Sequence, residues 1–155
     1  MKSLAEFVNE NTSHKRYVDV IAFNHDYDFL VLRRANYLKN FRGQWGVVGG
    51  AIEKNETSQD AAYRELREET GIKKSQIEEM WKFTEINHEN GNVTEVWVAD
   101  LKENFKPDSI KISGEHAQYK WIYGLDQIGK GKWMPDLTEV LEKFIKERIT
   151  CYNGC

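Results

Sequence analysis

Cysteine and proline are both scarce in this chain of 155 residues, which has two of each. Cys151 and Cys155 lie at the C-terminal end, and one Cys-x-x-x-Cys pair is too little for a zinc site or for the disulfide framework of a small secreted fold. The two prolines lie far apart, and neither a linker nor an internal repeat is visible. We therefore expect a single domain over residues 1–155, with a tail at 150–155.

Long apolar runs are also missing, and neither sign of charge dominates. The first ten residues carry two acids and no apolar run, so we expect no signal peptide, no transmembrane segment and a cytoplasmic location. Residues 1–14 are expected either to form a short docking helix or to fray. Lys and Arg number 22 and Asp and Glu 25, a net charge of −3, which is not typical of a nucleic-acid binder. A small anionic substrate would then need a local basic or metal-lined pocket.

Runs of β-branched and aromatic residues between turn residues predict a sheet. The expected strands cover residues 17–23, 29–33, 45–52, 82–86, 93–99 and 119–123. A helix at 58–70 has Thr57 as its N-cap and Gly71 as its C-terminal stop, and apolar residues at helical spacing predict a last helix at 136–147. Strands mixed with two helices predict an α/β (α+β) fold in which a mixed β-sheet is sandwiched between helices.

Three acids of the helix at 58–70 fall on one side of it. Glu65 precedes Glu68 and Glu69 by three and four residues, so the side chains can gather there. Their repulsion costs about 0.2–0.5 kcal/mol per pair and becomes attraction if a divalent cation lies between them. The alternative is an ordinary solvated helix face, in which Arg64 and Glu68 form an i,i+4 ion pair. Oxygen ligands of this kind suit Mg²⁺ or Mn²⁺.

The residues around these acids decide between the two interpretations. They follow the pattern G-x5-E-x7-R-E-U-x-E-E-x-G-U, in which U is a bulky aliphatic residue. Its defined positions are Gly50, Glu56, Arg64, Glu65, Leu66, Glu68, Glu69, Gly71 and Ile72. This pattern is the Nudix box, and the chain resembles the Nudix hydrolase family (MutT-like). The resemblance implies the Nudix fold and an enzyme that hydrolyses a phosphoanhydride bond with Mg²⁺ or Mn²⁺ as its cofactor.

The resemblance also implies roles for individual residues. Glu68 and Glu69 are implied as metal ligands, together with the carbonyl of Gly49. Glu65 is implied as a further ligand or as the base that deprotonates the attacking water. Arg64 is implied as the residue that orients the carboxylates by ion pairing.

Two residues beyond the box are candidates for the same site. Glu115 precedes a Tyr-x-Trp strand, which is similar to the place where many Nudix enzymes bring a distant acid to the metals. The alternative is an ordinary loop acid. His116 is a candidate general base, as in the GDP-mannose-hydrolysing branch of the family, because imidazole titrates near working pH. It can equally be a loop histidine.

Four further residues are candidates for binding the substrate. Arg33 and Arg34 can offer paired donors to phosphate oxygens, but strand alternation places them on opposite faces, so at most one is expected to serve. Trp133 and Asp136 resemble the segment where triphosphate-cleaving relatives recognise a purine. The alternative, which we favour, is that Asp136 caps the last helix.

Together these observations predict a Mg²⁺-dependent pyrophosphohydrolase of a small nucleotide, with a (deoxy)nucleoside triphosphate as the leading substrate. One alternative is a nucleotide-sugar (GDP-mannose-like) or ADP-ribose hydrolase, in which His116 matters more than Trp133 and Asp136. Another is a Nudix-fold ligand sensor without catalysis, which the intact box disfavours. Net charge disfavours an RNA end-processing enzyme. A homodimer is compatible with the resemblance, and no membrane partner is expected.

Overall fold

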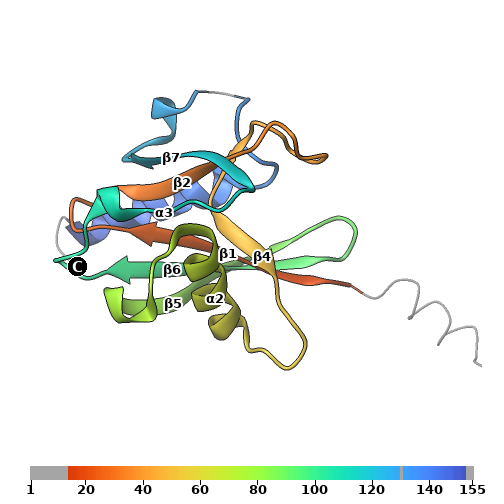
Figure 1. Ribbon diagram of the computed structural model, residues 1–155, viewed down its shortest axis with the longest axis horizontal. Helices are drawn as coiled ribbons and strands as arrows, with labels where there is room; N and C mark the ends of the chain where they lie inside the picture. The colour runs from red at the N-terminus through yellow and green to blue at the C-terminus, as the bar shows by residue number, and fades with distance from the viewer. Residues whose placement is uncertain (1–13, 130, 153–155) are drawn as a thin grey trace, which may run out of the picture.

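The structure is a computed structural model that describes residues 14–129 and 131–152 (Figure 1). The expected N-terminal helix at 1–14 lies outside the described residues except for its last position. The predicted tail at 150–155 lies outside them only from residue 153, because α3 runs to Tyr152. Three short 3-10 turns join the main elements, at Lys74–Gln76, Pro107–Ser109 and Leu125–Gln127. The main elements, in chain order, are β1 (Arg16–Phe23), β2 (Phe29–Arg34), β3 (Trp45–Gly46), β4 (Val48–Ala51), α2 (Ser58–Thr70), β5 (Ile77–Asn87), β6 (Val93–Leu101), β7 (His116–Ile122) and α3 (Thr138–Tyr152).

The strands form one mixed sheet of seven strands in the order β3-β2-β1-β6-β5, with β4 added to β1 and β7 added to β2. β1 runs parallel to β6, and the other pairs are antiparallel. Along one edge of strand β1, Phe23 pairs with Phe29 of β2, and Tyr17–Val20 pair with β4. β2 and β4 therefore part from each other along β1 (Figure 1).

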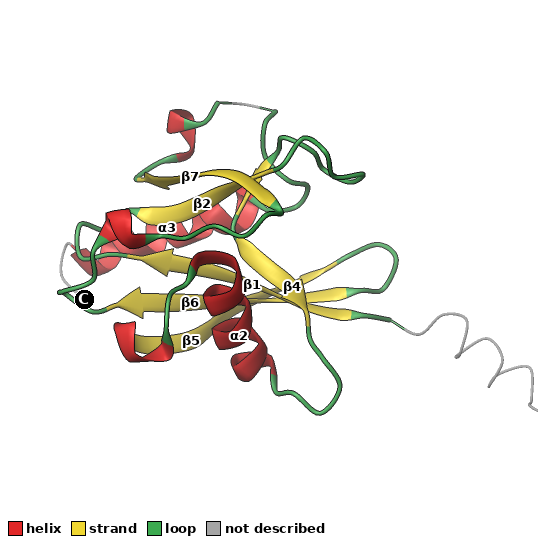
Figure 2. Cartoon of the chain, in the orientation of Figure 1, coloured by secondary structure: helices red, strands yellow, loops and turns green. Residues whose placement is uncertain are grey.

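The two helices cover opposite faces of the sheet, because successive side chains of a strand point to opposite sides (Figure 2). Val20 of β1 is buried in a core with Ala62 and Leu66 of α2. Its neighbour Ile21 is buried in a second core with Phe144 of α3. The predicted sandwich is confirmed, and no helix among the described residues is long and apolar enough to cross a membrane.

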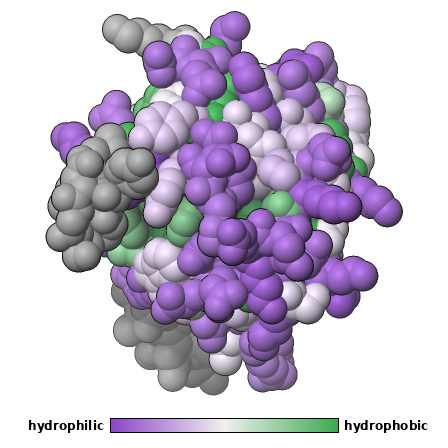
Figure 3. Space-filling view, turned by 90° about the vertical axis from the view of Figure 1, so that its left-hand side faces the viewer, coloured by the Kyte–Doolittle hydropathy of each residue, from purple (hydrophilic) through white to green (hydrophobic). Residues whose placement is uncertain are grey.

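The outer surface is polar on the side away from the β5–β6 turn. Hydrophilic residues predominate on the face that Figure 3 shows, with apolar residues scattered among them. Among the described residues, the exposed large hydrophobic side chains are Tyr37, Phe41 and Tyr123. The displayed face has no extended apolar patch that would indicate a dimer interface. The homodimer stays a prediction.

The ends of α2 agree with the sequence. The Thr57 side chain accepts a hydrogen bond from the backbone N–H of Asp60 at 3.1 Å, and Gly71 ends the helix at φ 78°, where it donates to the carbonyl of Arg67. Glycine reaches this left-handed conformation without a steric cost. The helix that carries the acids is therefore held at both ends by the predicted residues.

Several predicted boundaries are wrong. β7 begins at His116 instead of residue 119, the expected strand at 45–52 is divided into β3 and β4, and α3 runs to Tyr152 instead of residue 147. The last helix begins at Thr138, and Asp136 cannot be its cap because this residue has φ 65°, outside the extended region of an N-cap. β5 begins at Ile77 instead of residue 82. Its pairing with β6 shifts register twice, between Ile77 and Glu79 and between Lys82 and Thr84. Such bulges break the alternation on which the prediction depended.

Candidate active site

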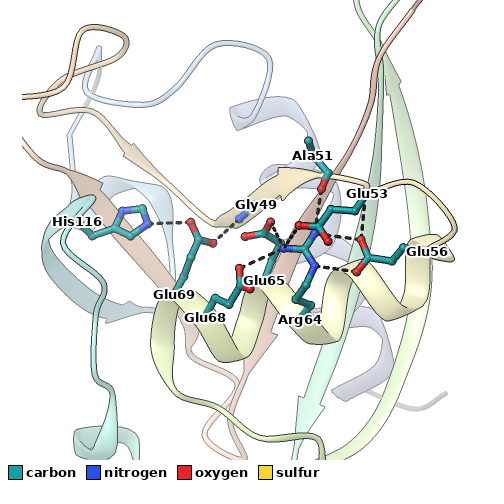
Figure 4. A network of polar contacts seen from close by, with 9 residues as sticks. All are labelled: Gly49, Ala51, Glu53, Glu56, Arg64, Glu65, Glu68, Glu69 and His116. Carbon is teal, nitrogen blue, oxygen red and sulfur yellow. Dashed lines mark hydrogen bonds and ion pairs between the residues drawn. The ribbon is translucent and has the colours of Figure 1, made fainter.

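Strand β4 and helix α2 meet at a close contact between glycine backbone and carboxylates (Figure 4). The backbone N–H of Gly49 donates to Oε2 of Glu69 at 2.9 Å. A methyl group on Gly50 would overlap the Glu65 carboxylate, and one on Gly49 would overlap the side chain of Asp19. Only glycine allows the strand to approach the acids this closely. The expected role of the Gly49 carbonyl as a metal ligand stays a prediction.

Arg64 lies at the centre of the acidic side chains (Figure 4). Its Nε and Nη2 donate to the two carboxylate oxygens of Glu56 at 2.7 and 3.0 Å. Its Nη1 donates to Glu65 at 2.8 Å and to Glu68 at 3.1 Å, and Nη2 also donates to the carbonyl of Ala51 at 3.0 Å. The bond from Arg64 holds the pKa of Glu56 below its usual value. Arg64 thus ties the loop after β4 to α2 and fixes the direction of two acids, as its predicted orienting role requires.

Glu65 and Asp19 have unusual protonation equilibria. Burial raises the pKa of Glu65 to about 7, against the lowering effect of its bond from Arg64 and with a further rise from Glu69. Burial and the nearby Glu69 raise the pKa of Asp19 to about 7. Loss of contact with solvent is thus the main reason that both carboxyls keep their protons to a higher pH.

Glu69 joins α2 to the loop before β7. Its Oε1 lies 3.0 Å from Nε2 of His116, and both side chains are buried. Ligand atoms of Glu69, Glu115 and His116 all lie within 4.8 Å of one another. The distant acid predicted from the sequence is thus next to the helix acids. Nδ1 of His116 is buried and has no hydrogen-bond partner among the described residues.

These residues fit a hard divalent cation. Glu69 of α2 and Glu115 of a separate loop bring carboxylate oxygens within 4.8 Å of each other and of a His116 ring nitrogen. Glu65 and Glu68 lie outside this cluster, and both accept hydrogen bonds from Arg64. Mg²⁺ and Mn²⁺ prefer oxygen ligands of this kind. Burial is the main cause of the raised pKa of Glu65, and Glu69 and Glu68 raise it further, so a cation between these acids would relieve their repulsion.

A cavity of 450 Å³ extends from the acids into the gap between β1 and β2. Gly49, Glu69 and His116 line one end of it, and Arg34 lines its wall. Nε of Arg34 donates to the carbonyl of Asn40 at 3.0 Å. Arg33 does not line the cavity. The structure thus separates the two arginines as strand alternation predicts, and Arg34 is the one that faces the cavity.

The far end of the cavity is formed by the segment before α3. Asp136 lines it, and its Oδ2 lies 3.3 Å from Nδ1 of His88, whose Nε2 lies 2.8 Å from the hydroxyl of Thr94. The Trp133 side chain is buried in the core beneath α3. The backbone of Trp133 forms an isolated β-bridge with Trp45. Of the two residues predicted for purine recognition, the structure brings Asp136 to the cavity and places the Trp133 side chain in the core.

Comparison with known proteins identifies the family. A family model described as the NUDIX domain matches residues 13–144. The chain belongs to the NUDIX family. The predicted NUDIX fold and hydrolase class are confirmed, and the protein is a hydrolase of phosphoanhydride bonds.

Individual relatives agree with this assignment. The asymmetrical bis(5′-nucleosyl)-tetraphosphatase of Sus scrofa is 28% identical over 120 residues, covering 75% of this chain and 77% of that protein. The RNA pyrophosphohydrolase of Bartonella tribocorum is 30% identical over 133 residues, covering 70% of this chain and 76% of that protein. The crystal structure of the MutT protein from Methanosarcina mazei Go1 matches with a TM-score of 0.59 and 26% identity, covering 92% of this chain and 96% of that chain. The NUDIX relatives therefore differ in their substrates.

Three residues of this NUDIX site were missed from the sequence. Asp19 lines the cavity near Glu69, and a signal was present, because it is an acid within the apolar strand YVDVIAF. Phe41 and His88 line the far end. Both come from loop or turn regions without a recognisable motif, so nothing in the sequence placed them near the box.

The acidic cluster makes the stability of the NUDIX domain depend on pH. The carboxyls of Asp19 and Glu65 have pKa values of about 7 in the folded protein, whereas free aspartate and glutamate side chains have values of 3.8 and 4.5. Between about pH 4 and pH 7 the folded state binds more protons than the unfolded chain, so the free energy of unfolding falls as pH rises and levels off above pH 7. We expect a loss of about 5 kcal/mol from pH 5 to pH 8, since each of the two carboxyls titrates over about two pH units and one unit corresponds to about 1.4 kcal/mol.

Urea denaturation in EDTA at several pH values measures this loss. Glu65→Gln removes one titrating carboxyl and should flatten the dependence, whereas Glu103→Gln, at an exposed position outside the site, should not. Adding Mg²⁺ at pH 8 should restore stability, because a ligand of the folded state stabilises it. A wild-type protein that becomes more stable from pH 5 to pH 8 in EDTA would contradict the account.

Proposed function

We propose that this protein is a Mg²⁺-dependent pyrophosphohydrolase of nucleoside diphosphate derivatives, with the anhydride at the α2 acids and the nucleoside in the cavity. The observation that carries the proposal is the continuity of the 450 Å³ cavity from Glu69 to Asp136. This arrangement allows one ligand to present phosphates to the acids and a base to the far end. The cytoplasm, which contains Mg²⁺ and nucleotides, is the compartment that suits this activity.

Each residue of the acidic cluster has a task in this proposal. Glu68 and Glu69 hold the cation, with Glu115 close by. When bound, the cation neutralises phosphate charge and activates water. Glu65 suits the general base, because burial brings its pKa to about 7, near working pH. His116 suits a positioning role, because its Nε2 already contacts Glu69 within a buried environment.

The choice of substrate is inferred from the residues at the far end of the cavity. Asp136 can accept a hydrogen bond from the edge of a base, and His88 holds its carboxylate in place. A (deoxy)nucleoside triphosphate fits this arrangement. A bis(5′-nucleosyl) tetraphosphate is a second candidate, favoured by the similarity to the Sus scrofa relative. The complete set of acids argues against a sensor without catalysis.

A substrate panel tests the proposal. The purified protein is incubated with Mg²⁺ and ATP, dGTP, bis(5′-adenosyl) tetraphosphate, ADP-ribose, GDP-mannose or a triphosphorylated RNA, and the products are separated by chromatography. We expect Mg²⁺-dependent cleavage of a small nucleotide class. Tight binding of a panel member without cleavage of any would instead support a ligand sensor.

Exchange of Asp136 for Asn is expected to change base preference. An amide offers a donor where the carboxylate offers only acceptors, so the ratio of kcat/KM between adenine and guanine substrates should shift about tenfold. Asp126→Asn, at an exposed residue that lines neither cavity, is the matched control. An unchanged ratio in Asp136→Asn would remove Asp136 from base recognition.

His116→Gln separates the two proposed roles of the histidine. If His116 positions Glu69, kcat should fall while the profile keeps its acidic limb, in which activity rises with pH up to about 7, since Glu65 remains as the base. If the profile instead loses that limb, His116 is the general base, and the nucleotide-sugar alternative gains support.

A further inference from the structure

A histidine nitrogen lies among the carboxylates of the site. A ring nitrogen of His116 and carboxylate oxygens of Glu69 and Glu115 all lie within 4.8 Å of one another. The His116 ring points toward Glu69 (Figure 4), and these two side chains are only 5% and 9% exposed. Glu115, in contrast, is exposed. The cluster therefore combines one nitrogen and two oxygen donors, with its exposed side at Glu115.

A β-bulge turns His116 toward these acids. On β7, Ile122 packs into the core beneath α3, whereas Trp121 packs against the core beneath α2. Strict alternation would place His116 on the side of Ile122, because an even number of residues separates them. The pairing of β7 with β2 shifts register next to Arg34, so the alternation is broken before it reaches His116. The side chain of His116 therefore contacts Glu69 of α2.

The distances within the cluster suit ligands of one ion. Nε2 of His116 lies 3.0 Å from Oε1 of Glu69. Bonds of about 2.1 Å to an octahedral ion place neighbouring ligand atoms about 3.0 Å apart and opposite ones about 4.2 Å apart. The largest separation in the cluster, up to 4.8 Å, is only slightly longer. A small rotation of the exposed Glu115 side chain would bring all three donors to one ion.

The charge of the cluster also calls for a cation. In the part of the chain that the structure describes, neither Glu69 nor Glu115 forms an ion pair with a lysine or an arginine. Glu65 and Glu68 differ, because both are paired with Arg64. Two carboxylates beside a neutral imidazole carry two negative charges, which one divalent ion balances, and buried charge is stable only when it is balanced in this way.

We propose that Glu69, Glu115 and His116 bind one divalent ion of the first transition series, and that the nitrogen ligand makes the protein prefer such an ion over Mg²⁺. Imidazole is a good ligand for transition ions, whereas Mg²⁺ prefers oxygen. This inference rests on the proposed cation site and deepens it. With its Nε2 lone pair on the ion, His116 cannot accept a proton from water at that atom. Its positioning role is then to hold the ion beside Glu69.

Calorimetry without substrate tests the preference. Metal-free protein is titrated with MgCl₂, MnCl₂ or CoCl₂, in the full chain with Cys151→Ser/Cys155→Ser, so that no thiolate competes for the ion. We expect the dissociation constant of Co²⁺ to be at least about tenfold below that of Mg²⁺, with Mn²⁺ between them. Equal dissociation constants for Co²⁺ and Mg²⁺ would overturn the inference.

His116→Gln tests whether the nitrogen is the cause. It should raise the dissociation constant of Co²⁺ at least about tenfold and that of Mg²⁺ less than about threefold, because only the nitrogen ligand is lost. His25→Gln is the matched control, at an exposed histidine that lines neither the active-site cavity nor the larger groove between the β5–β6 hairpin and α3. An unchanged ratio of the two constants in His116→Gln would overturn the inference.

Electron spin echo spectroscopy of bound Mn²⁺ detects the ligand without relying on the fold of a variant. We expect coupling to one imidazole nitrogen in the protein with His116 in place, and the same coupling in His25→Gln. Its absence would overturn the inference. If the coupling is present but no nucleotide is cleaved, the proposed function fails and the metal site stands. If nucleotides are cleaved with Mg²⁺ and the coupling is absent, the metal site fails and the proposed function stands.

Discussion

Glu68→Gln is expected to lower kcat about 10²–10³-fold and to leave the fold intact. The Glu68 side chain is 55% exposed, and its ion pair in the structure is with Arg64, so its removal costs little stability. The substitution keeps the shape of the side chain but removes an anionic oxygen from the proposed cation ligands. Steady-state kinetics in saturating Mg²⁺, together with urea denaturation, measure both effects.

The control for this variant is Asp60→Asn on the first turn of the same helix. Asp60 is exposed and lies away from the acidic cluster, so kcat should remain within about twofold of wild type. If Glu68→Gln retained most of the wild-type kcat while Asp60→Asn lost it, the reaction would not take place at the predicted turn of α2.

Arg64→Met is expected to lower the free energy of unfolding by about 3 kcal/mol. The side chains of Arg64, Glu56 and Glu65 are only 19%, 14% and 12% exposed, so removal of the guanidinium leaves two acids largely buried without their cation. Arg64→Lys should recover only part of this loss, because an ammonium group cannot bind Glu56 with two parallel hydrogen bonds. Urea denaturation in EDTA measures the change.

Two comparisons make this prediction specific. Arg67→Met removes an exposed arginine from the same helix and should cost at most about 0.5 kcal/mol. The double variant Glu56→Gln/Arg64→Met should lose less than the sum of the single variants, because the two residues share their main contact. Additive losses, or an Arg64→Met protein as stable as Arg67→Met, would show that the network contributes little to stability.

The acidic half of the site could be predicted because it is local in the chain. Glu65, Glu68 and Glu69 occupy one stretch of helix, and the caps Thr57 and Gly71 define where that helix starts and stops. Helical spacing alone brings these acids together. Glu115 is distant in sequence but was found through the resemblance to Nudix enzymes, and the structure places it beside Glu69.

The substrate half could not be predicted, because it is assembled from separate segments. Phe41, His88 and Asp136 come from three loops that meet only when β2, β5 and the segment before α3 pack together. Local patterns were misleading here. Pro135-Asp136 before a helix is typical of a cap, but the contact with His88 and a positive φ place Asp136 in the cavity instead.

The proposed activity requires the acids of α2 to support hydrolysis of a nucleotide phosphoanhydride with Mg²⁺. The most direct test follows bis(5′-adenosyl) tetraphosphate by ³¹P nuclear magnetic resonance in the presence of the protein, once with Mg²⁺ and once with EDTA. We expect loss of anhydride resonances and the appearance of two nucleotide products with Mg²⁺ and not with EDTA, and a far slower reaction in Glu68→Gln. Persistence of every anhydride resonance in Mg²⁺, or equal cleavage in EDTA, would contradict it.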